Sequence, residues 1–275
     1  VNFTVEVSDG TQTLSLPVTT EIYTGTMTTS ILSTSTGGQG PTAITGHGDR
    51  LYVANASSNT VSVLDAATGA VVGTVPVGAA PTALAISPDG KTLYVASTAG
   101  NTVSAISTTT GTVLASVPVT DPRGLALNDT GTRLYVTSTG TDRVIVLSTT
   151  TGATVASIPV GSRPVGIAYS STYARVYVAN RDGATVSVID AATNTVVGTI
   201  AVGSAPQQVV LNADGTRLYV TNTGGNSVSV IDTVTRDVLA TIAVGPSPNA
   251  IALSRDGSVG YVVNANNTVS VINLI

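Results

Sequence analysis

A short phrase built around Tyr-Val returns six times along the chain, and its spacing constrains the fold more than any other feature. The tyrosines of these phrases are Tyr52, Tyr94, Tyr135, Tyr177, Tyr219 and Tyr261. Successive tyrosines stand 42, 41, 42, 42 and 42 residues apart. Such a regular period indicates one supersecondary unit repeated head to tail. The repeats begin near residues 41, 81, 122, 164, 206 and 248.

One repeat, residues 81–120, predicts four strands and no helix. The short apolar run 81–86 ends at Ser-Pro-Asp-Gly, a turn in which glycine supplies the positive φ that a tight hairpin needs. Residues 91–97, 102–106 and 113–117 are rich in β-branched residues and are separated by polar turns. No window shows a helical period. Each repeat is therefore expected to be a four-stranded antiparallel meander.

A single meander of this size cannot bury both of its apolar faces. Stacked sheets bury them at a spacing of about 10 Å. Six or more four-stranded sheets in sequence close into a ring, which is the β-propeller. We therefore expect an all-β propeller, with residues 41–275 forming six regular repeats. The repeated Tyr and Val are expected to pack between blades.

Residues 1–40 leave the number of blades open between two interpretations. The final repeat has only three strands, so a fourth strand from residues 29–38 could pair with its edge and close a six-bladed ring. Alternatively, the hairpin-like pattern of residues 3–18 and a third strand at 21–29 form a degenerate first blade. The hairpin also resembles the closing strands of immunoglobulin-like modules. The spacing favours seven blades.

The repeat phrases resemble those of a known family. The Tyr219–Asn222 phrase Tyr-Val-Thr-Asn, the Ser-Pro-Asp-Gly turn and the Val-Ile-Asp phrases at 188–190 and 230–232 are similar to those of the YVTN-type β-propeller family. The resemblance covers residues 41–275. It implies a seven-bladed propeller from a bacterial or archaeal surface-layer or secreted protein. An extracellular or cell-surface location follows from it, with the periplasm as an alternative.

Composition excludes several classes of partner. Charged residues make up 9% of the chain, the net charge is −4 and there is no run of basic residues, so duplex nucleic acid is not an expected partner. No apolar stretch is long enough to insert in a membrane. The chain begins at Val1 inside a strand-like pattern without an initiator Met, so we expect flanking domains of a longer polypeptide.

The chain offers few residues that could act in catalysis. Cysteine is absent and His47 is the single histidine, placed in a turn where other repeats carry Asp-Gly. One imidazole without an evident partner is more often a solvated turn residue than a catalytic group. Metal clusters of His and Cys are excluded by count. No catalytic residue, metal ligand or cofactor is therefore predicted.

Comparison between repeats indicates one candidate binding site. Where copies differ, packing does not dictate the residue, and the position after the proline that begins each repeat varies widely: Thr42, Thr82, Arg123, Val165, Gln207 and Asn249. First strands of blades line the propeller axis, so these side chains should surround one mouth of the channel. The predicted ligand-binding residues are Asp121, Arg123, Arg163, Gln207, Gln208 and Asn249. The competing interpretation is ordinary solvated polar residues at a wet channel.

Three functions follow in order of preference. The first is a non-catalytic secreted or cell-surface module that binds protein or glycan partners or serves adhesion. The second is a propeller enzyme, as in similar propellers that resemble lactonases or subunits of periplasmic dehydrogenases. The third is single-stranded DNA binding, which needs aromatic stacking platforms and basic grooves. The chain has no Trp and one Phe, which places DNA binding last.

Overall fold

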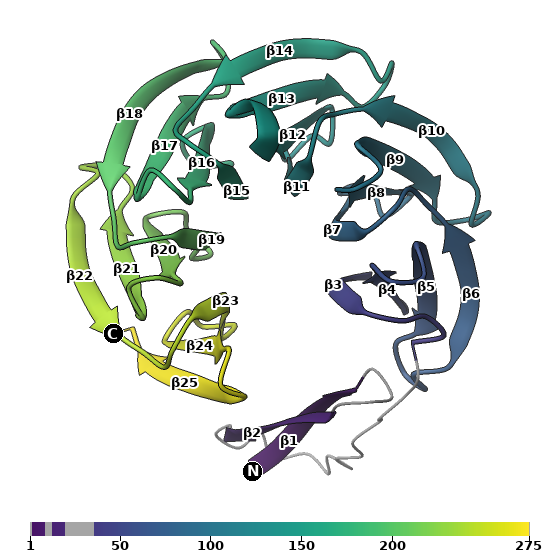
Figure 1. Ribbon diagram of the computed structural model, residues 1–275, viewed down its shortest axis with the longest axis horizontal. Helices are drawn as coiled ribbons and strands as arrows, with labels where there is room; N and C mark the ends of the chain where they lie inside the picture. The colour runs from purple at the N-terminus through teal and green to yellow at the C-terminus, as the bar shows by residue number, and fades with distance from the viewer. Residues whose placement is uncertain (1, 9–12, 20–35, 275) are drawn as a thin grey trace.

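The computed structural model describes residues 2–8, 13–19 and 36–274 and shows six β-sheets around a central axis, in a ring that is open between the last sheet and the first (Figure 1). Five sheets have four antiparallel strands and the sixth has three. Within each sheet the strands follow chain order from the axis to the rim, so each repeat is a meander. The predicted architecture, a β-propeller of four-stranded antiparallel blades, is confirmed.

The strand bounds follow the repeats. Blades 1 to 3 consist of β3 (Pro41–His47), β4 (Arg50–Asn55), β5 (Thr60–Asp65), β6 (Val71–Pro76); β7 (Pro81–Ile86), β8 (Thr92–Ser97), β9 (Thr102–Ser107), β10 (Val113–Pro118); β11 (Pro122–Leu127), β12 (Arg133–Ser138), β13 (Arg143–Ser148) and β14 (Thr154–Pro159). Blades 4 to 6 consist of β15 (Pro164–Ser170), β16 (Arg175–Asn180), β17 (Thr185–Asp190), β18 (Thr195–Ala201); β19 (Pro206–Leu211), β20 (Arg217–Asn222), β21 (Ser227–Asp232), β22 (Val238–Ala243); β23 (Pro248–Leu253), β24 (Val259–Asn264) and β25 (Thr268–Asn273). One 3₁₀ turn, Thr139–Thr141, connects β12 to β13. No helix among the described residues is long and apolar enough to cross a membrane.

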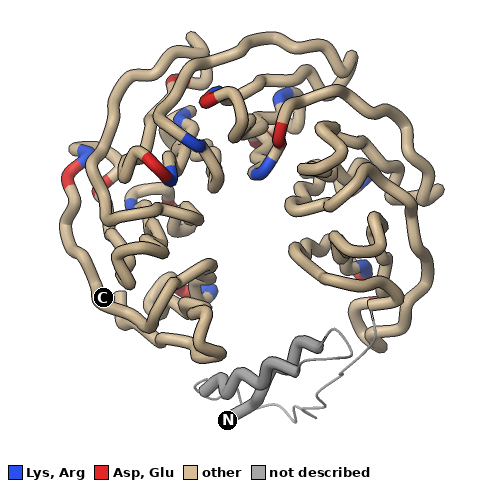
Figure 2. Tube along the Cα trace, in the orientation of Figure 1, with Lys and Arg blue, Asp and Glu red and all other residues tan. Residues whose placement is uncertain are grey.

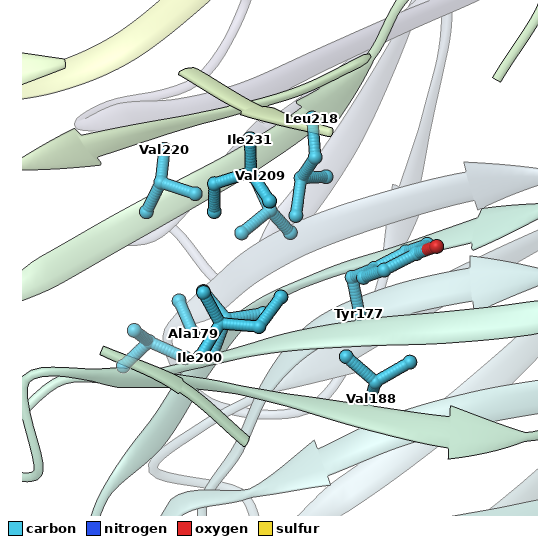
Figure 3. Close-up of a cluster of buried hydrophobic side chains, with 10 residues drawn as sticks. Tyr177, Ala179, Val188, Ile200, Val209, Leu218, Val220 and Ile231 are labelled. Carbon is cyan, nitrogen blue, oxygen red and sulfur yellow. The ribbon is translucent and has the colours of Figure 1, made fainter. Parts of the chain in front are cut away.

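The hydrophobic core is divided among the junctions between blades. Between blades 4 and 5, Tyr177 and Val188 face Leu218 and Ile231, and each of these side chains is at most 1% exposed (Figure 3). Close packing of β-branched and aromatic side chains from facing sheets stabilises this arrangement. Five of the six repeated tyrosines are buried in this way, as the sequence predicted: Tyr52, Tyr94, Tyr135, Tyr177 and Tyr219.

The outer strands carry a repeated irregularity at the rim. In all five four-stranded blades the register shifts by one residue near the start of the outer strand, which marks a β-bulge. The bulged residue is an exposed aliphatic one in every case: Val72, Leu114, Val155, Val197 and Leu239. Bulges twist a sheet edge and interrupt its unpaired backbone groups, which discourages edge-to-edge association.

The number of blades differs from the favoured prediction. The structure shows six blades and not seven, because strands β1 (Asn2–Ser8) and β2 (Thr13–Thr19) pair only with each other in a two-stranded sheet. Pro17 removes one backbone N–H from β2, and proline is tolerated mainly on edge strands. The third strand expected at residues 21–29 lies outside the described residues. So does most of the closing strand expected at residues 29–38.

The last blade and the first do not pack against each other as the other neighbouring blades do. Ile44 of β3 is 65% exposed and Val271 of β25 is 62% exposed, whereas Ile251 and Val188, at the matching positions of other blades, are 4% and 1% exposed. The described residues therefore leave two apolar sheet faces uncovered at this one place in the ring.

Candidate functional site

The candidate site lies where the six inner strands begin. Each inner strand starts with a proline, at residues 41, 81, 122, 164, 206 and 248, and we call the side of the ring on which these residues lie the proline face. The loops before the inner strands and the turns between second and third strands meet on this face. The turns between first and second strands lie on the opposite face, and the exposed His47 is the last residue of β3 before one of them.

A β-bulge follows the proline in every blade, and it explains why the next position is free to vary. The register shifts between Pro41 and Ala43 in blade 1 and between Pro122 and Leu125 in blade 3, and the other four inner strands behave alike. A bulge bends the strand and re-aims the side chain at that point. The predicted site positions Arg123, Gln207 and Asn249 all lie on these bulges.

The residue before each proline has a left-handed backbone, and neighbouring blades hold it in place. Asp121 has φ 44° and Arg163 has φ 56°. Before blades 2, 3, 4 and 6, an Asn or Asp in the preceding blade accepts a hydrogen bond from the backbone N–H of this residue. In blade 3 the acceptor is Asp142 Oδ1, 2.7 Å from Arg163 N. Equivalent bonds join Ala80 to Asn59, Asp121 to Asn101 and Ser247 to Asn226 at 2.8–2.9 Å. We call these the junction bonds.

Charged side chains on the proline face occur only at blades 3 and 4 among the described residues. They are Asp121, Arg123, Asp142, Arg143, Arg163, Arg181 and Asp182. Every other loop of this face consists of Gly, Ala, Ser, Thr, Asn, Gln, Val and Pro. Figure 2 shows how few charged positions the second and sixth blades carry in comparison. In a protein with 9% charged residues, this grouping is the strongest electrostatic feature of the face.

The guanidinium group of Arg123 has an ion-pair partner at Nε and, among the described residues, none at its two terminal nitrogens. Its Nε lies 3.2 Å from Asp121 Oδ1, and the arginine side chain is 42% exposed. The described structure gives its two terminal nitrogens no partner. A guanidinium that is oriented at Nε presents its terminal N–H groups to a planar acceptor such as a carboxylate.

Arg163 and Arg181 lie together on the proline face of blade 4, Arg163 just before β15 and Arg181 just after β16; we call this place, with Arg123 of blade 3, the arginine corner. The backbone N–H of Arg181 donates to the carbonyl of Arg163 at 3.0 Å, so the two residues stand side by side. Arg163 has a single ion-pair partner, Asp182, with Nη1 and Oδ2 3.7 Å apart and both side chains about half exposed. An exposed pair at this distance contributes little to stability. The Arg181 side chain is half-buried and has no partner among the described residues.

Arg181 was not among the residues predicted for the site, although the repeats contain the signal. Its position in blades 2, 3 and 5 is occupied by Thr98, Thr139 and Thr223. Each of these hydroxyls donates to the first carbonyl of the next inner strand, at Pro122, Pro164 and Pro248, over 2.6–2.9 Å. Arginine in blade 4 replaces this bond between blades with an unpaired cation. Packing therefore does not account for Arg181.

Of the remaining predicted residues, Gln208 has a structural hydrogen bond, whereas the side chains of Gln207 and Asn249 have none among the described residues. Gln208 Oε1 accepts a hydrogen bond from Ile251 N at 2.6 Å, so its carboxamide joins blades 5 and 6. Gln207 is half-buried and Asn249 is exposed, and neither side chain has a hydrogen bond within the described structure. The inner strands of blades 3 and 4 are adjacent, which brings Arg123 and Arg163 to neighbouring blades of one face. The described residues contain no group of three or more His, Cys, Asp or Glu side chains that could hold a metal ion.

Fold and repeats together define a β-propeller repeat protein, and comparisons with known proteins agree. The sequence profile of a family described as outer membrane protein assembly factor BamB matches residues 20–128 and 57–155, which include blades 1 and 2 and part of blade 3. No curated protein matches the chain at a significant level.

Solved structures share the fold at low sequence identity. A chain of Kuenenia stuttgartiensis hydrazine synthase is 21% identical with a TM-score of 0.64, over 90% of this chain and 99% of that one. A Desulfotomaculum acetoxidans protein described as functionally unknown is 18% identical with a TM-score of 0.72, over 82% of this chain and 79% of that one. At these identities the likeness concerns the fold alone.

Proposed function

We propose that this protein is a non-catalytic binding module of the cell exterior, and that its proline face binds an acidic group of a glycan or protein partner over blades 3 and 4. The observation that carries the proposal is a set of three arginines with free guanidinium nitrogens, Arg123, Arg163 and Arg181, in the one charged part of the proline face. Arg123 and Arg163 have partners at only one guanidinium nitrogen, and Arg181 replaces a threonine that bonds neighbouring blades elsewhere.

The chemistry of the corner selects the class of ligand. Guanidinium groups bind carboxylates and sulfated or phosphorylated groups through paired N–H donors. Three aspartates stand among the arginines, and two of them already accept ion pairs from Arg123 and Arg163. An incoming carboxylate would compete with these exposed aspartates and would place its charge against Arg181. Gln207 and Asn249 supply neutral donors and acceptors further around the ring, suited to sugar hydroxyls.

The proposal extends to family and location. Repeats built on Tyr-Val-Thr-Asn support membership of the YVTN-type propellers, and through that resemblance a secreted or surface-layer protein. The low charge and the abundance of Thr and Ser on the exposed loops fit a rigid, weakly charged exterior module.

Binding of an acidic oligosaccharide tests this function. Oligogalacturonate should bind the protein in calorimetry at low salt, and an uncharged glucan of the same length should not. Arg163→Ala and Arg181→Thr should each weaken oligogalacturonate binding about ten- to a hundredfold, because a hydrogen bond to a charged group contributes about 1.5–3 kcal/mol. Arg181→Thr introduces the residue that three other blades carry and should fold normally.

A matched control removes an arginine from the opposite face. Arg255 is exposed in the turn between β23 and β24, so Arg255→Ala makes the same change in net charge away from the site. It should leave binding unchanged. Equal weakening by Arg255→Ala and Arg181→Thr would show that net charge and not this corner attracts the ligand, and absence of binding in the parent would refute the proposed acidic ligand.

A second candidate function is that of a subunit in an enzyme complex. The observation that favours it is the likeness to a chain of hydrazine synthase over 99% of that chain. In that case the proline face would contact an enzyme subunit, and co-purification of a stable complex from the native source would reveal it.

A further inference from the structure

A cavity of about 310 Å³ lies between blades 2 and 3, toward the rim and the opposite face from the arginines. Its walls are Val103, Ala105 and Val117 of blade 2 and Leu134 and Leu147 of blade 3. The turn Thr149–Gly152 and the exposed bulge residue Leu114 form its rim. Residues at the same positions of other blades line the other blade-to-blade junctions. Comparing them with the lining residues shows why a cavity forms between blades 2 and 3.

The cavity owes its space to two departures from the repeat. Ala105 stands where the other five blades carry valine: Val63, Val146, Val188, Val230 and Val271. Thr92 stands where four blades carry arginine: Arg50, Arg133, Arg175 and Arg217. In blades 1, 4 and 5 that arginine is paired with an aspartate of the neighbouring strand. Blade 2 has Ser107 opposite Thr92, so both members of the ion pair are absent and the space that they would fill is open.

The lining determines what the cavity can hold. None of its residues is charged; half are aliphatic and most of the others carry a neutral hydroxyl group, so an ionic ligand would lose its hydration without an opposite charge to compensate. Thr92 is half-buried, and its hydroxyl has no hydrogen-bond partner among the described residues. A cavity of roughly 150 Å³ lined by aliphatic side chains accommodates benzene. A volume about twice as large suits a molecule of two fused rings.

We propose that this cavity is a binding site for a neutral bicyclic aromatic compound that carries one hydroxyl group. The rings would lie between Ala105 and Leu134, and the hydroxyl would bond Thr92 at the open end. Leu114, which is 61% exposed, would cover the bound rings from the rim. The site is separate from the arginines of the proline face and does not depend on their function.

Titration with 2-naphthol tests the proposal, and the absence of Trp leaves the fluorescence of this probe unobscured by the protein. We expect saturable binding of one molecule per chain. Ala105→Val restores the valine of the other blades, narrows the cavity where the rings would lie and should weaken binding at least tenfold while the fold is retained. Ala252→Val adds the same two methyl groups at an exposed position of β23 and should leave the affinity unchanged. Replacing the probe with charged 2-naphthoate should also weaken binding at least tenfold.

The results separate the proposal from non-specific adsorption. Binding that survives Ala105→Val, or that Ala252→Val weakens equally, would overturn it, and so would absence of saturation by 2-naphthol. Should Ala105→Val fold poorly, Thr92→Arg offers a second variant, because it restores the residue of four other blades at the open end. Thr92→Val keeps the shape, removes the hydroxyl, and should weaken 2-naphthol binding more than binding of naphthalene itself.

Discussion

A leucine recurs at the same position of the second strand in several blades. Replacing it with alanine in two of these blades measures how well each leucine is buried against a neighbouring blade. Leu218 of β20 is 0% exposed and packs against Tyr177 and Ala179 of the preceding blade. Leu51 occupies the same position in β4, is only half-buried and lies on the side of blade 1 against which no other described blade packs closely. Removing a fully buried leucine costs the transfer free energy of its side chain and a further amount for the cavity left behind.

The expected costs differ by about 2 kcal/mol. Leu218→Ala should lower the free energy of unfolding by about 3 kcal/mol, near the middle of the range for buried leucines. Leu51→Ala should lower it by about 1 kcal/mol, because part of that side chain is already in contact with water. Urea unfolding followed by circular dichroism gives both values, and the slope with denaturant should stay the same for the two variants. Equal costs would refute the reasoning, since they would mean that Leu51 is covered as well as Leu218.

Two further predictions concern backbone space and acid stability. Gly161→Ala should destabilise the protein by about 1–3 kcal/mol, because the added methyl carbon would lie 2.6 Å from the carboxamide of buried Asn180. Gly73→Ala, where the nearest atom is 3.9 Å away, should be neutral in the same unfolding assay, and a cost equal to that of Gly161→Ala would contradict the steric explanation. The Ser254 hydroxyl, followed by the donors of Ser258, lowers the pKa of Asp256 to about 2. A folded-state pKa below the unfolded value means that stability from this carboxylate is present above about pH 4 and is lost as the pH falls toward 2. Titration of Asp256 by NMR should show that pKa, and a midpoint near 4 would remove the basis for this acid sensitivity.

Much of the fold could be predicted because the core residues and the turn residues recur at the same positions in the repeats. Inner strands begin at the prolines where the repeats begin, and Asn59 and Gly90 adopt the left-handed conformations that tight turns need. The number of blades could not be predicted from the same signals. Residues 1–40 lie outside the period, and their strand-like patterns are compatible with a blade, a hairpin or a closing strand.

The candidate site could be predicted only in part. Comparing the position after the proline identified Arg123, because its neighbours in other blades are uncharged. Gln208 was predicted because it stands beside that position, and its carboxamide instead bonds the backbone of Ile251. A sequence does not show that a side chain reaches across to the next sheet. Arg181 was missed because the sequence does not show what the threonines at its position do in other blades. Only the structure shows that Thr98 and Thr139 bond the next blade, which makes an arginine at this position unusual.

The junction bonds also bear on how the chain reaches its folded state. Each described bond joins residues only 20 or 21 positions apart, as between Arg163 and Asp142. Low contact order favours rapid folding, because little loop entropy is lost before a contact forms. During synthesis, a blade can therefore attach to its predecessor as soon as the next few residues leave the ribosome. Four of the six blades, the second, third, fourth and sixth, can attach to their predecessors through these bonds in this progressive way.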